Sequence, residues 1–254
     1  MTNGRPHVEF HDVSAWYGRK QVLRNVSFTV PRNSVLGVIG PANSGKTTLL
    51  KIINRTLDFV DGAHFTGDVL IDCENVRDVR DANALRRRIG MVFPLPVGLP
   101  LTIYENVVYA PRRMGISGKA ELDEIVERCL RQAVLWDEVK DRLNMLGTRL
   151  SGGQQQRLTL ARALSLSPEI LCLDEFSIAI DPVTTMRIEE VLKELRKTLT
   201  IVLVTNLVQQ ARRLADNTLF LWRAEVVEHS STDIVFSERP KDRRTYDYVN
   251  GIFG

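Results

Sequence analysis

The clearest chemistry-bearing pattern in the sequence is a glycine-containing segment that ends in a lysine and two threonines. Residues 40–48 match the G-x-x-x-x-G-K-[ST] pattern of a phosphate-binding loop and follow a short apolar run. In such a loop, successive backbone N–H groups and the start of the next helix face a phosphate. We expect Lys46 to reach the β- and γ-phosphates and the Thr47 hydroxyl to bind Mg²⁺. The predicted nucleotide-binding residues are Gly40, Pro41, Ala42, Asn43, Ser44, Gly45, Lys46, Thr47 and Thr48.

Two adjacent acids end another apolar run. Ile170–Leu173 has the length of a buried strand, and Asp174 and Glu175 follow it directly. Ligands of open α/β sheets bind beyond the carboxyl ends of the strands, so carboxylates suit this position. We expect Asp174 to hold Mg²⁺, through water, and Glu175 to polarise the attacking water. Alone, the pair fits a solvated turn equally well, but beside a phosphate loop it indicates nucleotide hydrolysis.

A second helix start that could bind an anion is expected at Ser151. The sequence Leu-Ser-Gly-Gly-Gln-Gln-Gln-Arg at 150–157 precedes a helical pattern. Ser151 can cap this helix while the N–H groups of Gly152 and Gly153 face an anion. A simple helix cap is the alternative. Because the chain already has one phosphate loop, residues Ser151, Gly152, Gly153 and Gln154 would cover the ATP of a second copy, which predicts a two-fold dimer.

The elements that position these residues alternate between short apolar runs and helical patterns. Buried strands are predicted at 35–39, 170–173, 199–204 and 219–222, and a helix at 182–197 that Asp181 caps. This alternation predicts an α/β fold with a mainly parallel sheet. Residues 8–31 alternate apolar and polar positions, which predicts an antiparallel N-terminal β subdomain. We expect one domain over 1–254, with a helical subdomain inserted at about 98–164.

Composition narrows the class of protein. The 254 residues are 44% hydrophobic and 26% charged, which excludes a disordered chain, a collagen-like repeat and a small disulfide scaffold. The 34 basic and 31 acidic residues give a net charge of +3, too balanced to indicate a nucleic-acid partner. No run approaches the ~20 apolar residues of a membrane span, and no signal peptide is recognisable. We therefore expect a soluble chain, without a histidine or cysteine metal site.

Together, the phosphate loop, the Leu-Ser-Gly-Gly-Gln segment and the acidic strand end resemble the ATP-binding subunits of ABC transporters over nearly the whole chain. The resemblance implies a P-loop NTPase fold of ABC type, with ATP and Mg²⁺ as cofactors and Lys46 and Glu175 as catalytic residues. It implies that Tyr17 stacks on adenine and that Asp181 lies at the dimer interface. It also implies that the helical subdomain contacts two integral membrane permease subunits at the cytoplasmic face of the cell membrane.

Residues 91–93, 100–107, 209–213 and 245–254 look most similar to the phosphate-import ATPases of the bacterial Pst system. This resemblance implies phosphate as cargo and, indirectly, a periplasmic or extracellular phosphate-binding protein as a partner. Because no residue of this chain would touch the cargo, another polar solute such as an amino acid is an alternative. A second alternative is a soluble switch protein that acts on ribosomes or DNA. Such proteins generally carry two nucleotide domains or long coiled-coil inserts, which this chain lacks.

Two positions depart from the family pattern. Pro94 stands where the family carries glutamine, and Asn206 where it carries histidine. A glutamine oxygen can ligate Mg²⁺ and orient water, whereas proline has neither a polar side chain nor an N–H. Asn206 can still donate a neutral hydrogen bond to a phosphate, but it is shorter than histidine. We hypothesise a slow or regulatory ATPase; the alternative is that these positions tolerate change or that nearby groups replace them.

Overall fold

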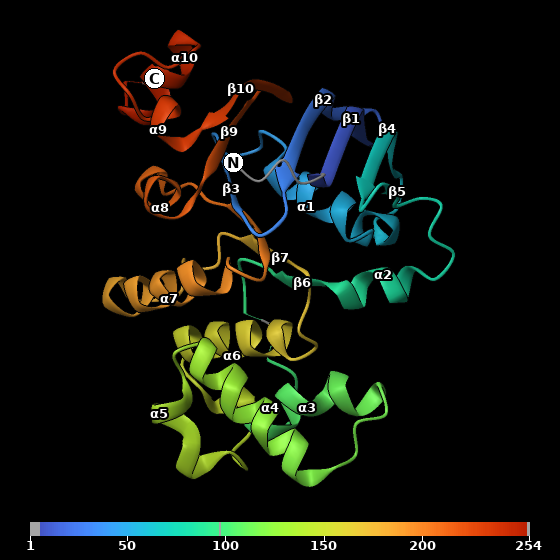
Figure 1. Cartoon of the computed structure of the whole chain (residues 1–254), viewed down its shortest axis with the longest axis vertical. Coiled ribbons are helices and arrows are strands. Elements are labelled where there is room, and N and C mark those ends of the chain that lie inside the picture. Colours follow the sequence, from blue (N-terminus) through green and yellow to red (C-terminus); the bar gives the residue numbers. More distant parts are fainter. Residues whose placement is uncertain (1–5, 97, 253–254) are drawn as a thin grey trace.

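Two sheets and a helical region make up the chain, for which the computed structural model describes residues 6–96 and 98–252 (Figure 1). One sheet has four strands in the order β2-β1-β4-β5, and the other has six in the order β10-β9-β3-β8-β7-β6. Figure 1 shows α3, α4 and α5 at one end of the molecule and the C-terminal α9 and α10 at the other. The two sheets lie between these ends.

The six-stranded sheet is the core that carries the predicted acids and the phosphate loop. Its parallel strands are β6 (Ile89–Val92), β7 (Ile170–Asp174), β8 (Thr200–Val204), β3 (Val35–Ile39) and β9 (Asn217–Trp222), and β10 (Glu225–Ser231) is antiparallel to β9. β3, β7 and β8 are buried at every residue, as expected of a parallel sheet that is covered on both faces. The four strands predicted from the apolar runs are confirmed, and β9 begins two residues earlier than predicted.

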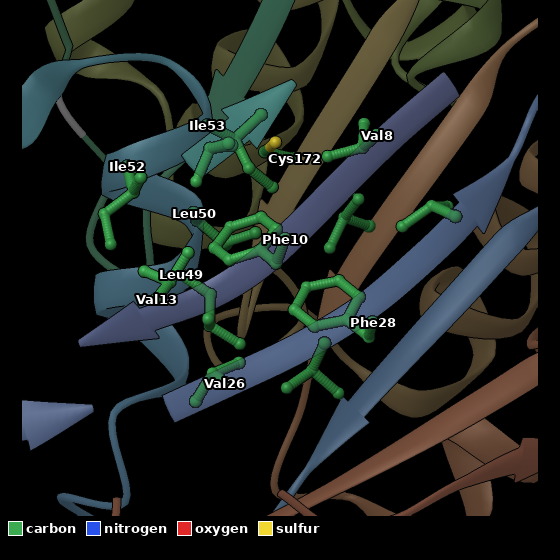
Figure 2. Close-up of a cluster of buried hydrophobic side chains, with 14 of the residues drawn as sticks. Val8, Phe10, Val13, Val26, Phe28, Leu49, Leu50, Ile52, Ile53 and Cys172 are labelled. Atoms are coloured by element: carbon green, nitrogen blue, oxygen red, sulfur yellow. The ribbon is translucent and has the colours of Figure 1, made fainter. Parts of the chain in front are cut away.

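The four-stranded sheet is antiparallel and is the predicted N-terminal β subdomain. Its strands are β1 (Pro6–Tyr17), β2 (Lys20–Pro31), β4 (Ala63–Ile71) and β5 (Glu74–Asn75). One face packs on α1 and on the parallel sheet. In Figure 2 the rings of Phe10 and Phe28 are stacked, with centroids 4.5 Å apart, beside Leu49 and Leu50 of α1. Neither β4 nor β5 was predicted from the sequence.

The helices cover both faces of the parallel sheet. They are α1 (Lys46–Ile53), α2 (Ala82–Arg88), α3 (Ile103–Arg113), α4 (Lys119–Gln132), α5 (Trp136–Val139), α6 (Gly152–Leu164), α7 (Pro182–Leu195), α8 (Val208–Leu214), α9 (Thr232–Val235) and α10 (Arg243–Val249), with 3₁₀ turns at Thr56–Phe59, Lys140–Arg142 and Gly147–Arg149. α3, α4, α6 and α7 share one apolar cluster with the second sheet face. As predicted, Asp181 caps α7 by accepting a hydrogen bond from the Thr184 N–H at 2.9 Å.

A charged cluster with a buried histidine joins the two sheets. His7 of β1 is fully buried; its Nδ1 lies 2.7 Å from the Thr200 hydroxyl of β8, and its Nε2 lies 3.8 Å from Asp72 and 3.7 Å from Glu169. Both carboxylates also pair with arginines: Arg32 and Arg88 each contact Asp72 and Glu169. Burial lowers the pKa of His7, and the charge of Arg32 lowers it further, although both carboxylates oppose the shift.

We therefore predict that the folded chain loses stability as the pH falls below about 6.5. The unfolded histidine takes up a proton near its ordinary pKa of 6.5, whereas folded His7 resists it, so the free energy of unfolding decreases with falling pH. Each unit of pKa difference corresponds to about 1.4 kcal/mol. Burial also lowers the pKa of His229, so His7 accounts for only part of this effect. The His7→Gln variant should therefore lose less stability between pH 7.5 and 5.5 than the unchanged chain. Thermal unfolding at the two pH values measures this difference.

The exposed His11 provides the matched control, since it pairs only with Glu9 at the surface. The His11→Gln variant should lose at least as much stability between pH 7.5 and 5.5 as the unchanged protein. Equal pH dependence of the unchanged chain and the His7→Gln variant would contradict the role assigned to His7.

Candidate nucleotide site

The loop between β3 and α1 is crowded by backbone from two other strands. Gly40 (φ +150°) and Gly45 (φ +106°) adopt conformations that favour glycine, and a Cβ on them would lie 2.0 Å from the Leu221 carbonyl oxygen and 2.4 Å from that of Val22. Asn43 is also left-handed, with φ +62°, which asparagine tolerates better than most residues. The chain therefore holds one tight loop conformation at the start of α1.

A cavity of about 530 Å³ lies over this loop. Residues 42–48 line it together with Tyr17, Lys20, Val22 and Glu175. Most of the predicted nucleotide-binding residues are thus brought to one hollow, to which β1, β2, α1 and the end of β7 contribute. Its position at the carboxyl edge of the parallel strands is where α/β sheets bind ligands.

The Lys46 ammonium is held inside the loop. Its Nζ donates to the carbonyl oxygens of Gly40 and Pro41, each at 2.8 Å, and the side chain is 5% exposed. Burial lowers the pKa of Lys46, while the charges of Glu175 and Asp174 oppose this shift. An ammonium has three donors, so one remains for a phosphate oxygen while the other two stay on the loop.

Asp174 is a buried carboxylate that is poorly compensated by the protein. It is 1% exposed, and within residues 6–96 and 98–252 neither of its oxygens meets the geometry of a hydrogen bond, although the Thr47 hydroxyl lies close by. Burial raises the pKa of Asp174 and the charge of Glu175 adds to this shift, whereas the Thr47 hydroxyl and the Lys46 ammonium oppose it. A buried carboxylate is costly unless it is paired or coordinates a metal, and Mg²⁺ prefers hard oxygen ligands. Asp174 together with the Thr47 hydroxyl at the start of α1 therefore fits a magnesium ion.

Asn206 lies against Glu175 in this structure. The Asn206 side-chain amide donates to Glu175 Oε1 at 2.6 Å, and the Glu175 N–H donates to the Val204 carbonyl at 2.9 Å. Glu175 has φ +46°, a left-handed conformation that is uncommon for a residue with a side chain and that often marks a functional position. One carboxylate oxygen is thus held by Asn206, and the other can face a water molecule.

Of the two neighbouring aromatic residues, Tyr17 faces the cavity. Its hydroxyl lies 3.3 Å from the Thr48 hydroxyl, and the Lys51 ammonium is 5.9 Å from its ring centroid. Trp16 instead stacks on His64, with centroids 5.0 Å apart. Successive side chains of a strand point to opposite faces, so only one of the pair can reach a nucleotide base. The placement of Tyr17 is compatible with the stacking role that the sequence predicted for it.

The Ser151 segment does not line the phosphate-loop cavity of its own chain. Ser151 and Gln154 form a capping box, in which the Gln154 N–H donates to the Ser151 hydroxyl at 3.4 Å and the Ser151 N–H donates to the Gln154 side chain at 3.1 Å. Ser151 and Gly152 are exposed. The start of α6 therefore lies outside the cavity of its own chain, with its first residues exposed.

Pro94 is likewise absent from the lining of this cavity. The loop that carries it is held from α6, where the 1% exposed Gln156 donates from Nε2 to the Phe93 carbonyl oxygen at 2.8 Å. Sequence reasoning missed Gln156 because nothing distinguishes it from the two glutamines before it except its place on the buried face of the helix. It also missed the buried Gln210 of α8.

We predict that Gly40→Ala weakens Mg·ATP binding at least tenfold, because the added Cβ would collide with the Leu221 carbonyl and displace the loop. Binding of a fluorescent ATP analogue measures the effect. Gly118→Ala is the control, since Gly118 has φ −65° and its Cβ would meet only ordinary contacts at 3.8 Å. Equal affinity of the Gly40→Ala variant and the control would contradict the tight fit of this loop.

Comparisons with known proteins bear on this geometry. A family model described as "ABC transporter" matches residues 23–177. Two curated relatives are each named "Phosphate import ATP-binding protein PstB". The one from Pseudoalteromonas translucida is 46% identical over 255 residues, covering 100% of this chain and 92% of the relative. The one from Shewanella denitrificans is 46% identical over 248 residues, covering 97% of this chain and 91% of the relative.

Solved structures with a similar fold agree with the family match. The dimeric ATP-binding cassette MJ0796, described as a post-hydrolysis state bound to ADP and Pi, is 30% identical with a TM-score of 0.78, covering 89% of this chain and 98% of that chain. The cbiO1 protein from Clostridium perfringens shares the fold. It is 23% identical with a TM-score of 0.79, and the match covers 92% of this chain and 91% of that chain. Family match, full-length relatives and loop geometry agree: this chain belongs to the ABC transporter family of ATP-binding proteins.

Proposed function

We propose that this chain is the ATP-binding subunit of an importer for inorganic phosphate and hydrolyses ATP to drive uptake through separate membrane subunits. The observation that carries the proposal is 46% identity along essentially the whole chain to relatives named as phosphate import ATP-binding proteins. The P-loop, the two acids and the Ser151 segment are all present. The cargo would bind to other chains: two integral membrane permease subunits and, indirectly, a phosphate-binding protein.

The site residues divide the work of ATP hydrolysis. The backbone N–H groups of the loop and Lys46 would bind the phosphates, and Thr47 and Asp174 would hold Mg²⁺. When bound, the ion neutralises charge on the β- and γ-phosphates. The free oxygen of Glu175 would accept a proton from the attacking water, while Asn206 keeps the carboxylate turned toward it. Glu175 lines the cavity together with the phosphate loop, which supports its role as the proton acceptor.

The exposed start of α6 supports a homodimer. Ser151 and Gly152 are exposed, and so are the apolar side chains of Ile178, Val183 and Leu207, at 62%, 72% and 58%. Gly153 lies against the segment that carries Ile178, since a Cβ on it would be 2.8 Å from the Ala179 carbonyl oxygen. Anion-binding N–H groups beside exposed apolar residues suit a second copy that brings its own bound ATP.

The helical region at 98–164 is the proposed contact with the permease subunits. It contains a hollow of about 1090 Å³ whose lining includes Tyr104, Leu122 and Trp136 beside charged residues such as Arg112 and Lys140. Within residues 6–96 and 98–252, no helix is long and apolar enough to cross a membrane. From the relatives named as phosphate import ATP-binding proteins, we infer a peripheral place on the cytoplasmic face of the membrane, where partner chains hold this chain.

Glu175→Gln is predicted to separate binding from cleavage. The amide cannot accept a proton from water, so ATP hydrolysis should fall at least a hundredfold while Mg·ATP binding stays within about threefold. The trapped nucleotide should hold two copies together, and light scattering after gel filtration measures their mass. Glu190→Gln on the exposed face of α7 is the control and should hydrolyse ATP normally. A Glu175→Gln variant that stays monomeric when saturated with Mg·ATP would exclude the proposed dimer.

The same substitution tests the cargo in membrane vesicles that hold the complete transporter. Phosphate uptake should require ATP and disappear with Glu175→Gln, and an amino acid supplied in its place should not be taken up. Uptake of the amino acid but not of phosphate would assign the alternative cargo. Recovery of the chain with ribosomes or DNA, rather than with polytopic membrane proteins, would assign the soluble switch.

Slow turnover is a second property that the site supports. Pro94 contributes no side chain to the cavity, and the Asn206 amide is used by Glu175. Water positioning then depends on fewer polar groups than the family pattern provides, which would lower the rate of cleavage more than the affinity for ATP.

We predict that Pro94→Gln combined with Asn206→His raises the steady-state ATPase rate about tenfold. The change restores two polar groups to the γ-phosphate end of the site, and KM for ATP should change less than threefold. Each single variant is measured beside the double variant. If the double variant is no faster than the unchanged chain, the hypothesis of a slow or regulatory ATPase fails.

A further inference from the structure

A buried glutamine amide lies behind the two residues that meet at the cleavage site. Gln210 of α8 is fully buried. Its Oε1 accepts from the Thr205 hydroxyl at 2.9 Å, and its Nε2 donates to the Ser177 hydroxyl at 3.3 Å and to Glu189 Oε1 at 3.2 Å. One side-chain amide thus binds the turn just before α8, the loop after β7 and a buried residue of α7.

The direction of every hydrogen bond in this network is fixed by Glu189. The Glu189 carboxylate of α7 is 2% exposed and accepts two hydrogen bonds from Arg213, each at 2.7 Å. A carboxylate is an acceptor only, so the NH₂ end of Gln210 must face it and the oxygen of Gln210 must face Thr205. Because the Gln210 oxygen can only accept, the Thr205 hydroxyl has to donate to it, and the same hydroxyl accepts from the Leu207 N–H at 3.0 Å.

One end of the network fixes the position of Asn206. Thr205 and Leu207 are both held through the Thr205 hydroxyl, and Asn206 lies between them. The side chain of Asn206 is the one that donates to Glu175 at 2.6 Å. Loss of the Thr205 hydroxyl would free the turn from which Asn206 reaches the carboxylate.

The other end fixes the loop that follows Glu175. Ser177 lies two residues after Glu175 and is 7% exposed. The Ile180 N–H donates to the Ser177 carbonyl at 3.0 Å, and the loop then leads into α7. The same amide therefore holds the backbone on both sides of the Glu175 to Asn206 hydrogen bond. Breaking a buried network of this kind leaves polar groups unpaired at a cost in free energy, so a satisfied network keeps its members rigid.

We propose that Gln210 is a positioning residue for ATP hydrolysis: through Thr205 and Ser177 it sets the placement of Asn206 against the Glu175 carboxylate. The inference rests on the proposed function, because it concerns the orientation of the proton acceptor in that reaction. Gln210 touches neither Glu175 nor the lining of the phosphate-loop cavity, and it acts only through the two loops.

Thr205→Val tests the proposal, because valine keeps the shape of threonine and removes the hydroxyl. We expect kcat to fall about tenfold while KM for ATP stays within twofold, since the P-loop still binds the nucleotide. Thr205→Ser restores the hydroxyl and should recover kcat to within twofold of the unchanged chain. Gln210→Met should lower kcat about as much as Thr205→Val, and the double variant should be no slower than Gln210→Met alone, because residues that act as a unit are not additive.

Thr218→Val is the matched control. Thr218 of β9 is also fully buried, and its hydroxyl lies 2.9 Å from the Thr232 hydroxyl, outside the network. This variant should unfold at a lower temperature and keep its kcat. The proposal is overturned if Thr205→Val keeps the original kcat, if Thr205→Ser fails to recover it, or if Thr218→Val loses as much.

A further measurement separates this inference from the proposed function. If the unchanged chain hydrolyses no ATP, the proposed function fails. Nuclear magnetic resonance of the Asn206 side-chain amide then tests whether the network positions Asn206. Thr205→Val should shift that resonance and Thr218→Val should not. An unshifted resonance in the Thr205→Val variant would overturn the positioning role even in an active enzyme.

Discussion

The parallel alignment of β7, β8 and β3 is the constraint on which the site depends. Val204 of β8 pairs with Val38 of β3 on one side and with Asp174 of β7 on the other. Parallel strands in this register end at one edge of the sheet, so the phosphate loop, the two acids and Asn206 emerge side by side. Backbone hydrogen bonds of the buried sheet hold that alignment. The strand ends of the core thus determine where the loops that carry these residues begin.

The crowding of the phosphate loop has an electrostatic consequence. The backbone of β2 and β9 lies against Gly45 and Gly40, and Lys46 of the same loop is only 5% exposed. A buried cation must be compensated, and two carbonyl oxygens do this inside the loop. Asp174 is less well compensated, since neither of its oxygens meets the geometry of a hydrogen bond among the described residues. A buried carboxylate of this kind is a suitable ligand for a divalent cation, and Lys46 keeps one donor for an anion.

Local signals carried most of the successful sequence predictions. The loop at 40–48, the acidic end of β7 and the capped start of α7 each depend on residues close together in the chain. β4 was missed because only its last residues are buried, so the apolar pattern is weak over most of its length. The hydrogen bond from Asn206 to Glu175 was missed for another reason. It joins residues 31 positions apart, and only the order of the strands in the sheet brings them together.

The two departures from the family pattern have a common structural background. Pro94 and Asn206 both lie in loops at the carboxyl edge of the sheet, and each loop is held by a buried glutamine on a neighbouring helix. Gln156 of α6 donates to the carbonyl just before Pro94, and Gln210 of α8 accepts from the residue just before Asn206. A short side chain can reach Glu175 only if its backbone is held close, so the asparagine needs a more rigid support than a longer residue would. Buried side chains behind the site therefore hold the backbone that carries both of these residues.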